Sequence, residues 1–326
     1  MPWEPVRSAM LSSTTGVFRE PHDFQVAMRE YGCTSMVVTD RGPFRARLTR
    51  IALHRLRLLT AEESLARIAS FSIPDNAILV SVPLGDNHLP AWGGTAVRSG
   101  EIITVGAGHR LHFRSTSPCR WGAILLPTRL LLSYARKING DALALPSGVC
   151  SWQPTTKAFR HLIRLHISAT RIANARVGVI TTSEAARALE HELIDAVSAC
   201  LSGKPAKSDN ETMTRHAKIM ARFEDLLQAH PSGVLTSAGI CLVLDVSPRT
   251  LRAYCRKRLG MGPNLYMRLH RMQLVRRALR CGDATNISVA QIAAQHGFTQ
   301  AGRFAGVYRA QFGELPSVTL RRSAGQ

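Results

Sequence analysis

Two helix-turn-helix patterns in tandem constrain this sequence more than any other feature. Residues 235–259 and 287–312 each read as an apolar helix, a tight turn and an amphipathic helix that carries Arg. A small residue stands in the middle of each apolar helix, because the two helices of such a motif cross closely. The turn residues are types that adopt positive φ more readily than most. A unit of this kind places its second helix in the major groove of DNA. The small residues are Cys241 and Ala293, and the turns fall at Asp245-Val246 and Gly297-Phe298.

The segment between the two motifs has the spacing of one long helix. Its apolar residues recur every three or four positions. The 18 residues from 263 to 280 would span about 27 Å at 1.5 Å per residue. A rigid connection of that length predicts two recognition helices about one DNA turn apart, near the ~34 Å between successive major grooves on one face. The apolar positions are Leu265, Leu269, Met272, Val275 and Leu279.

This arrangement resembles the AraC/XylS family of bacterial transcription regulators over residues 212–322. The most specific stretch is 297–322, which has Gly-Phe, Arg-Phe, Tyr-Arg, Phe-Gly and Pro in the family's order. Residues 247–251 and 259–272 match the first motif and the linking helix. Cys255 departs from the pattern because the family usually has Phe there, and the smaller Cys side chain fills less of the core. Gly306 stands where a basic residue is common, which puts one DNA contact of the second helix in doubt.

In the first recognition helix, we expect Leu251, Tyr254 and Cys255 to face inward. Arg249 and Arg252 then lie outward near the end of the helix that enters the groove. The resemblance places both at positions that touch bases, so we expect guanine contacts. Phosphate contact or plain solvation is the alternative for both. Three further residues join the predicted site: Ser247 as the helix cap, and Arg256 and Lys257 as phosphate contacts.

The second recognition helix has fewer long polar side chains, so we expect weaker base specificity from it. Gln300 suits adenine, and Arg303 suits guanine or phosphate. Ser288 is expected to cap the first helix of this motif and to donate to a phosphate. Thr299 is expected to cap the recognition helix and to face outward. The expected core residues are Phe304, Val307 and Tyr308.

The charge distribution supports a polyanionic partner. Residues 211–326 contain 17 Lys/Arg and 6 Asp/Glu, a net of 17 − 6 = +11 over 116 residues. Residues 1–210 contain 25 and 16, a net of +9 over 210 residues. Charge density is therefore about twice as high where the motifs lie, as expected of a domain that binds nucleic acid through counterion release. The chain has 36 Arg against 6 Lys, a bias that the base composition of the genome largely explains.

The sequence predicts two domains, 1–201 and 212–326, joined by a linker at 202–211. The linker is polar, contains Gly and Pro, and has no apolar periodicity. A helix is expected from about Thr212 to Ala229. The predicted fold class is α+β, with an N-terminal antiparallel β barrel or sandwich followed by helices and a C-terminal all-α domain.

Short apolar segments separated by turn signals predict the N-terminal sheet. Ser99-Gly100 is expected to form a hairpin turn. Helices are expected near 128–138, 155–174 and 183–200, and the last has Leu189, Leu193 and Val197 on one face. That face either packs on the barrel or forms a dimer interface. The resemblance implies a cupin-like barrel that binds an effector and dimerises. The predicted strand segments are 45–60, 67–73, 77–84, 95–106, 109–115 and 121–127.

The sequence contains no motif that indicates an enzymatic active site, a metal site or a cofactor site. His88, His109 and His112 are the only clustered His of the N-terminal region, and no Glu follows them at cupin spacing. Seven scattered Cys without a CxxC pair argue against a disulfide framework and a structural zinc site. There is no apolar run of membrane-spanning length and no signal peptide, so a cytoplasmic location is expected.

The sequence thus predicts a sequence-specific transcription regulator that is not an enzyme and uses no metal or cofactor. The expected partners are double-stranded DNA, a small-molecule effector, RNA polymerase by family resemblance and a second copy of the chain, but no membrane. Two alternatives stay open: a non-specific architectural nucleic-acid binder, and a Cys-dependent DNA-repair enzyme fused to the same DNA-binding domain. Four arginines give a weak indication of an anionic effector: Arg45, Arg47, Arg110 and Arg114.

Overall fold

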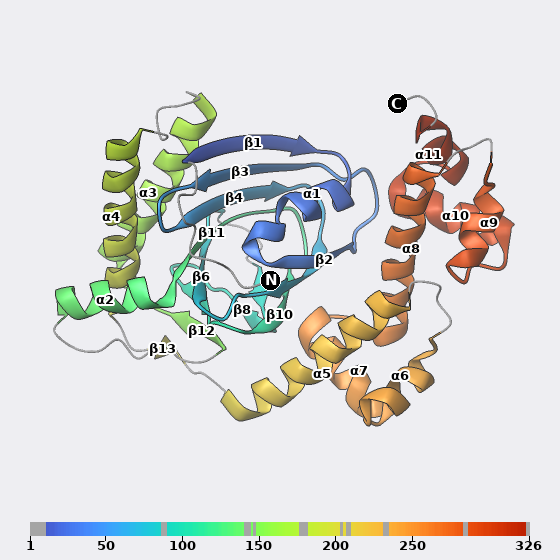
Figure 1. The fold of residues 1–326 in the computed structure, drawn as a ribbon. Helices are drawn as coiled ribbons and strands as arrows, with labels where there is room; N and C mark the ends of the chain where they lie inside the picture. The colour runs from blue at the N-terminus through green and yellow to red at the C-terminus, as the bar shows by residue number, and fades with distance from the viewer. Residues whose placement is uncertain are drawn as a thin grey trace.

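The chain folds into an N-terminal α+β unit followed by an all-helical C-terminal unit (Figure 1). The computed structural model describes residues 11–85, 90–139, 145, 148–175, 182–202, 205–206, 210–230, 235–282 and 286–323. The N-terminal unit runs from β1 to α4, and the C-terminal unit from α5 to α11. The predicted fold class is confirmed.

Two antiparallel sheets pack face to face in the N-terminal unit. Its strands are β1 (Ser12–Phe18), β2 (Cys33–Val38), β3 (Ala46–Ala52), β4 (Arg57–Glu63), β5 (Arg67–Ser72), β6 (Ala77–Pro83), β7 (Ala91–Trp92), β8 (Thr95–Ala96), β9 (Ile102–Val105), β10 (Arg110–Arg114), β11 (Cys119–Pro127), β12 (Val149–Trp152) and β13 (Pro205–Ala206). The larger sheet has the order β1-β3-β4-β11-β6-β9-β12-β13, and the smaller has β2-β5-β10-β7-β8. Helix α1 (Pro21–Ala27) and the 3-10 turn η1 (Arg29–Tyr31) lie between β1 and β2.

Each predicted strand segment contains at least one strand, whereas β1, β2, β7, β12 and β13 lie outside the predicted segments. The predicted hairpin at Ser99-Gly100 is wrong. A turn does occur there, but it joins β8 of one sheet to β9 of the other. The hairpin is at Gly93-Gly94, between β7 and β8, and both glycines have positive φ.

The space between the sheets is filled by aromatic rings around a buried ion pair. Arg67 pairs with Glu63, and neither side chain is exposed. Trp121 donates through Nε1 to Glu63 Oε1 at 2.8 Å, and the Arg67 guanidinium lies 4.4 Å from the Phe113 ring centre. Charges removed from water need such partners. The pair therefore fixes how β4, β5, β10 and β11 face one another.

Three helices cover the outer face of the larger sheet: α2 (Thr128–Asn139), α3 (Thr156–Ala175) and α4 (Ser183–Cys200). Leu193 and Val197 are fully buried against that sheet, and Leu189 is partly buried in the same cluster. Of the two alternatives for this helix face, packing on the sheet of the same chain is the one that holds for these three residues. Every residue of β6 is buried, which explains why this strand reads as a continuous apolar run rather than an alternating one.

The C-terminal unit contains both helix-turn-helix motifs. Its helices are α5 (Asn210–Ala229), α6 (Ser237–Leu244), α7 (Pro248–Leu259), α8 (Pro263–Cys281), α9 (Val289–Gln295), α10 (Ala301–Phe312) and α11 (Pro316–Ser323). The predicted long helix is α8, whose 19 residues span about 28 Å. The first helix begins two residues before the expected Thr212. Each motif has its own apolar cluster, and the N-terminal half of α8 belongs to one and the C-terminal half to the other.

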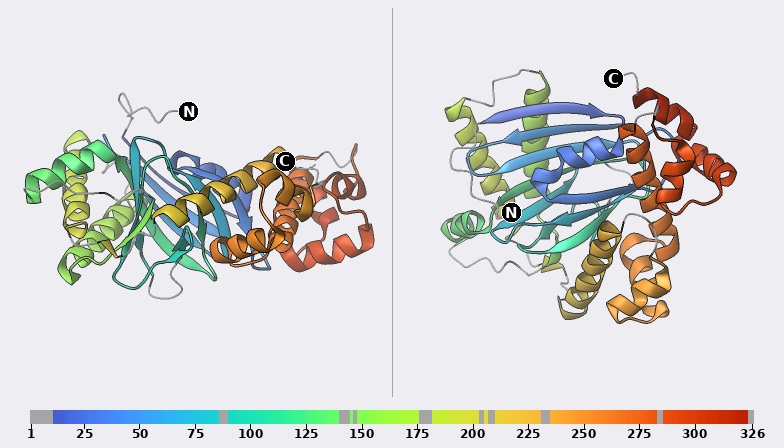
Figure 2. Two further views of the ribbon diagram at one scale, coloured as in Figure 1. Left: turned by 90° about the horizontal axis from the view of Figure 1, so that it is seen from below. Right: turned by 45° about the vertical axis from the view of Figure 1, so that its right-hand side comes forward.

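The C-terminal unit lies against the outer face of the smaller sheet (Figure 2). Val37 of β2 and Ile68 of β5 are buried in one apolar cluster with Phe223 of α5 and Tyr266 of α8. The order of layers is therefore helices, larger sheet, smaller sheet and helices. Among the described residues, no helix is long and apolar enough to cross a membrane.

Gly122 of β11 tests how tightly α3 packs on the larger sheet. A methyl group at this position would overlap the buried ring of His166 on α3 and lie 3.0 Å from Val82 Cγ2. We expect Gly122→Ala to lower the free energy of unfolding by about 1–3 kcal/mol, measured by chemical denaturation. Gly306→Ala is the control. Its added methyl group meets nothing within 4 Å, so the helix should become more stable. Equal stability of Gly122→Ala and wild type would contradict this account of the packing.

Candidate nucleic-acid interface

The first motif has the local geometry of a helix-turn-helix. Asp245, with φ of 52°, is the non-glycine residue of positive φ in the described chain, and it ends α6. Ser247 Oγ then accepts from the backbone N–H of Thr250 at 3.1 Å, and Pro248 opens α7. The predicted turn and the predicted cap are both confirmed.

The outward face of α7 is basic. Leu251 and Cys255 are buried and Tyr254 is partly buried. The four predicted contact residues are all exposed, and none forms an ion pair with a carboxylate in the described part of the chain. Their charges are therefore available to an external partner. These four residues are Arg249, Arg252, Arg256 and Lys257.

The second motif repeats this geometry except at the cap of its recognition helix. Ser288 and Gln291 form a capping box at the start of α9, with Ser288 Oγ accepting from Gln291 N at 3.2 Å. Gly297 has φ of 78°. The cap predicted at Thr299 is wrong, because the residue before α10 is Gln300 and its side chain makes no cap bond.

The buried face of α10 contains fewer residues than predicted. Phe304 and Tyr308 are buried one turn apart, but Val307 is 37% exposed. Helical spacing turns residue 307 by about 100° from residue 308, away from the stripe that faces α9 and α11. Thr299, Gln300 and Arg303 are exposed as predicted, and Gly306 lies in open space.

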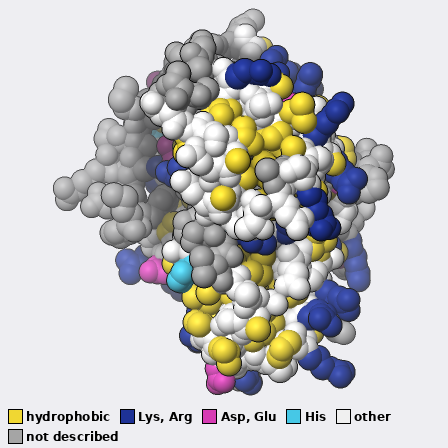
Figure 3. Space-filling view, turned by 90° about the vertical axis from the view of Figure 1, so that its right-hand side faces the viewer, with side chains coloured by type: hydrophobic (Ala, Val, Ile, Leu, Met, Phe, Trp, Pro, Cys, Tyr) yellow, Lys and Arg dark blue, Asp and Glu magenta, His cyan; other side chains and the backbone are white. Residues whose placement is uncertain are grey.

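Basic side chains gather along one margin of the C-terminal unit (Figure 3). Apolar side chains occupy the middle of the same view. The exposed arginines of α7 and α10 add positive charge to this unit, and none of them forms an ion pair with a carboxylate among the described residues. Such a distribution attracts the phosphate backbone of a duplex.

The C-terminal end of α7 is anchored to the N-terminal unit. Arg258 is buried, and its Nη1 donates to the Gly93 carbonyl in the β7–β8 hairpin. Burial lowers the pKa of this guanidinium. A methyl group at Gly94 would lie 3.0 Å from the Lys257 carbonyl oxygen, so glycine permits the close approach. The hairpin therefore holds one end of the recognition helix and leaves the other free.

The C-terminal end of α10 is anchored in the same manner to the loop between β2 and β3. Gln311 Nε2 donates to the Asp40 carbonyl at 2.7 Å, and the Gln311 carbonyl accepts from Gly42 N at 2.9 Å. The two recognition helices are thus attached to two different loops of one rigid sandwich. Their relative placement depends on that sandwich as well as on α8.

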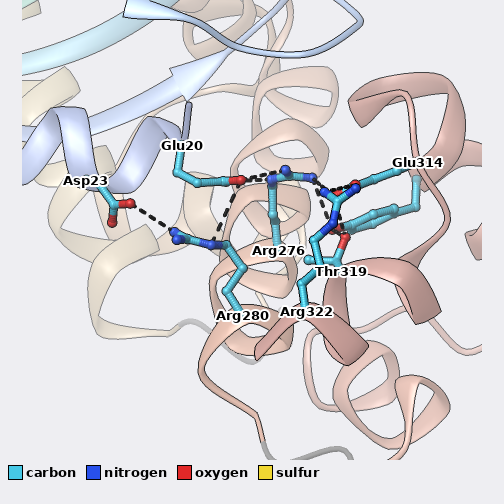
Figure 4. A network of polar contacts seen from close by, with 8 residues as sticks. Glu20, Asp23, Arg276, Arg280, Glu314, Thr319 and Arg322 are labelled. Carbon is cyan, nitrogen blue, oxygen red and sulfur yellow. Dashed lines mark hydrogen bonds and ion pairs between the residues drawn. The ribbon is translucent and has the colours of Figure 1, made fainter. Parts of the chain in front are cut away.

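An ion-pair network attaches α8 to α1 and the residue before it (Figure 4). Arg276 donates to both carboxylate oxygens of Glu20 at 2.8 Å, and it also lies 3.2 Å from Glu314. Arg280 reaches Asp23 at 3.2 Å. Burial alone would lower the pKa of Arg276, but the hydrogen bond and charge of Glu20 raise it. A bidentate, mostly buried pair of this kind also fixes orientation.

A buried carboxylate stands at the centre of the interface between the units. Glu224 of α5 is fully buried. It accepts from Tyr266 OH at 2.6 Å and Ser35 Oγ at 3.3 Å, and it lies 3.0 Å from His112 Nε2. Burial raises the pKa of this carboxyl, but the His112 hydrogen bond and charge, with smaller contributions from His270 and Tyr266, lower it below its usual value.

Sequence reasoning missed these interface residues. It treated His112 as an ordinary histidine and assigned no role to Glu224, Arg258 or Arg276. One signal was available, because Glu224 directly follows Phe223 on the apolar side of an amphipathic helix. An acidic residue at such a position is buried only if it has partners.

Metal and thiol chemistry find no support in the described residues. No group of three or more His, Cys, Asp or Glu is placed to hold a metal ion there. His109 contacts the Ala107 carbonyl at 2.9 Å, and His88 lies outside the described residues. Six of the seven cysteines are buried, and Cys281 is exposed. Burial raises the pKa of Cys33, Cys119, Cys200 and Cys255 to about 12, which is opposite to the activation that a nucleophilic thiol needs.

A family model described as a helix-turn-helix domain matches residues 240–322, which lie in the C-terminal unit. The chain is 38% identical over 97 residues to the probable thc operon regulatory protein of Rhodococcus erythropolis, covering 30% of this chain and 29% of that protein. It is 43% identical over 77 residues to XylDLEGF operon transcriptional activator 1 of Pseudomonas putida, covering 24% of this chain and 23% of that protein. The match thus spans less than a third of each relative's length.

Solved structures with low sequence identity extend over more of the chain. The AraC-like transcriptional activator CuxR is 18% identical, covering 80% of this chain and 94% of its own with a TM-score of 0.43. ToxT from Vibrio cholerae is 13% identical, covering 97% of this chain and 99% of its own with a TM-score of 0.29.

Glu224→Gln tests the buried carboxylate at the interface. The variant keeps the shape but removes the charge, so we expect a loss of about 1.5–3 kcal/mol in the free energy of unfolding at neutral pH. Because the folded pKa of Glu224 is depressed, its stabilisation is present above the usual value of 4.5 and is lost as the pH falls through the folded pKa.

The difference between wild type and Glu224→Gln should therefore shrink as the pH falls below 4.5. Chemical denaturation at a series of pH values measures it. The matched control is Glu30→Gln, whose carboxylate is 60% exposed. A difference that stays constant with pH would show that the charge of Glu224 does not stabilise the interface.

Proposed function

We propose that the protein is a sequence-specific DNA-binding transcription regulator of the AraC/XylS type, because a family model described as a helix-turn-helix domain matches residues 240–322. One observation carries the proposal. Both recognition helices are held at their C-terminal ends and present exposed polar side chains at their N-terminal ends. A helix-turn-helix reads bases with the N-terminal end of its second helix.

Each recognition helix has its own role in this proposal. Arg249 and Arg252 of α7 read guanines, and Arg256 and Lys257 contact phosphates. Gln300 and Arg303 near the start of α10 make the second set of contacts, and Thr299 borders them. Two serines at helix starts, Ser247 and Ser288, cap their helices and approach the phosphate backbone.

The remaining parts of the proposal concern regulation. Residues 1–201 form the effector-binding and dimerising domain, and residues 212–326 form the DNA-binding domain. A small molecule biases how the two DNA-binding domains of a dimer dock on half-sites, and RNA polymerase is the downstream partner. The protein acts in the cytoplasm and performs no catalysis. The names of the matched relatives, which describe operon regulators, agree with this role.

We place the homodimer contact on the exposed faces of α3 and α4. Helix α3 has no acidic residue in its 20 positions, and its exposed side includes Lys157, Arg160 and Arg164. The exposed side of α4 includes Glu184, Glu192 and Asp195, with one arginine, Arg187. The two faces have opposite net charges, so a two-fold axis would pair α3 of each copy with α4 of the other. Both helices lie at the end of the molecule away from the C-terminal unit (Figure 1).

Selection of bound sequences from a random duplex library tests the DNA-reading role. At about 0.15 M salt, we expect an enriched motif of two blocks about 10 base pairs apart. Arg249→Ala with Arg252→Ala should abolish one block, since each guanine contact contributes about 1–3 kcal/mol, or roughly 5- to 150-fold in affinity. Lys257→Ala is the comparison variant. It should weaken binding to all sequences alike and reduce the salt dependence by about one counterion.

The non-specific alternative predicts a different result in the same assay. Tight, salt-sensitive binding without enrichment, repeated with cell extract added to supply an effector, would contradict sequence-specific recognition. An enriched motif that survives in the Arg249→Ala, Arg252→Ala variant would contradict the assignment of these two residues.

A charge swap tests the dimer contact. Glu192→Lys with Asp195→Lys should weaken self-association, and adding Arg160→Glu with Arg164→Glu should restore it, because the pairs regain opposite charge. Sedimentation equilibrium measures both. Glu30→Lys, an exposed acid on η1, is the control. Undiminished self-association of the first variant would place the contact elsewhere.

A further inference from the structure

A cavity of about 380 Å³ lies where the two units meet, with walls from α1, η1, β2, α5 and α8. Its volume lies in the range of small-ligand sites. The cavity lies outside the space between the two sheets, where an effector site of the N-terminal domain would be expected. Three of the five elements belong to the N-terminal unit and two to the C-terminal unit, so a bound ligand would contact both units.

The cavity is lined by basic groups, and none of its lining residues carries a carboxylate. Arg29 and Arg277 line it, and in the described chain neither has an ion-pair partner. Arg276, the neighbour of Arg277 on α8, is paired with Glu20 and Glu314 instead. The cavity therefore has excess positive charge on one side.

The lowered pKa of His22 reflects the same excess of positive charge. This residue lines the cavity from α1. Burial lowers its pKa, and the positive charges of Arg277, Arg29 and Arg280 lower it further, while Asp23 acts in the opposite direction. Burial and these cations therefore disfavour the charged form of His22, and an anion in the cavity would offset the contribution of the cations.

A hydrogen-bond donor in the cavity wall lacks an acceptor. The Nε2 group of Gln273 is buried and has no hydrogen-bond partner in the described structure. A buried donor without a partner costs roughly as much free energy as a lost hydrogen bond. Gln273 lines the cavity, so a rotation of its side chain would present this buried donor to an acceptor atom placed there.

We propose that this cavity binds a small oxyanion, a carboxylate or a phosphate group, that accepts from Gln273 and pairs with Arg29 and Arg277. Such a ligand would connect η1 to α8 in addition to the existing Arg276–Glu20 pair. The Glu224 carboxylate contacts the lining residue Ser35. Its charge is already engaged by His112 and Tyr266, so it does not dominate the cavity.

Calorimetric titration of the full chain in the absence of DNA tests the site. The probes are inorganic phosphate, glycerol 3-phosphate and butanoate. We expect at least one to bind with a dissociation constant below about 1 mM. Binding by phosphates alone or by butanoate alone identifies the source of the oxyanion, and binding by both supports the shared chemistry.

Two variants and a matched control locate the binding. Gln273→Glu replaces the donor by a negative charge of the same shape, and Arg277→Gln removes a cation. Each should weaken binding of the successful probe at least about tenfold. Arg268→Gln, an exposed arginine on the same helix outside the cavity, should not. Circular dichroism checks that each variant is folded.

Failure of all three probes to bind wild type would overturn the proposal. An equal loss in Arg268→Gln would also overturn it, because the effect would then come from overall charge. Since the titration contains no DNA, either failure leaves the DNA-reading proposal unaffected, and a failed sequence selection leaves this site unaffected.

Discussion

The placement of the C-terminal unit depends on one buried carboxylate. Glu224 enters an apolar layer between a sheet and three helices, where an unpaired charge would cost several kcal/mol. It is tolerated because a histidine from β10, a tyrosine from α8 and a serine from β2 surround it. Those three elements must therefore meet α5 in one arrangement. Purely apolar contacts such as those of Val37 and Ile68 supply burial, but they would permit sliding that this set of directional bonds does not.

The fixed arrangement extends from Glu224 to both recognition helices. Arg258 and Gln311 lie at the C-terminal ends of α7 and α10, and each bonds to a backbone carbonyl of a sandwich loop. The long helix α8 alone would leave the two motifs free to rotate together against the sheets. With the two loop contacts and the Arg276–Glu20 pair, the sandwich becomes part of the frame that holds the two helices.

The sequence predicted local features well and the interface poorly. The turns at Asp245 and Gly297 and the long helix between the motifs follow from residue chemistry and spacing, which act over a few residues. The cap was predicted at Thr299, one residue too early, because a helix start can shift by a residue without changing the sequence pattern. Val307 was predicted to be buried because an apolar residue next to the buried face of a helix cannot be told from that face by its type alone. The contacts of Glu224, Arg258 and Arg276 join residues far apart in the chain, so no local pattern records them.

The shared apolar cluster has a consequence for how such chains diversify. Val37 and Ile68 are buried by residues of the other unit, so neither half has a finished surface of its own. A recombination event that exchanged one half for that of a distant relative would leave apolar side chains facing unmatched partners and Glu224 without its histidine. The two units therefore cannot be inherited as separate modules. A substitution at the interface in one unit requires a matching substitution in the other.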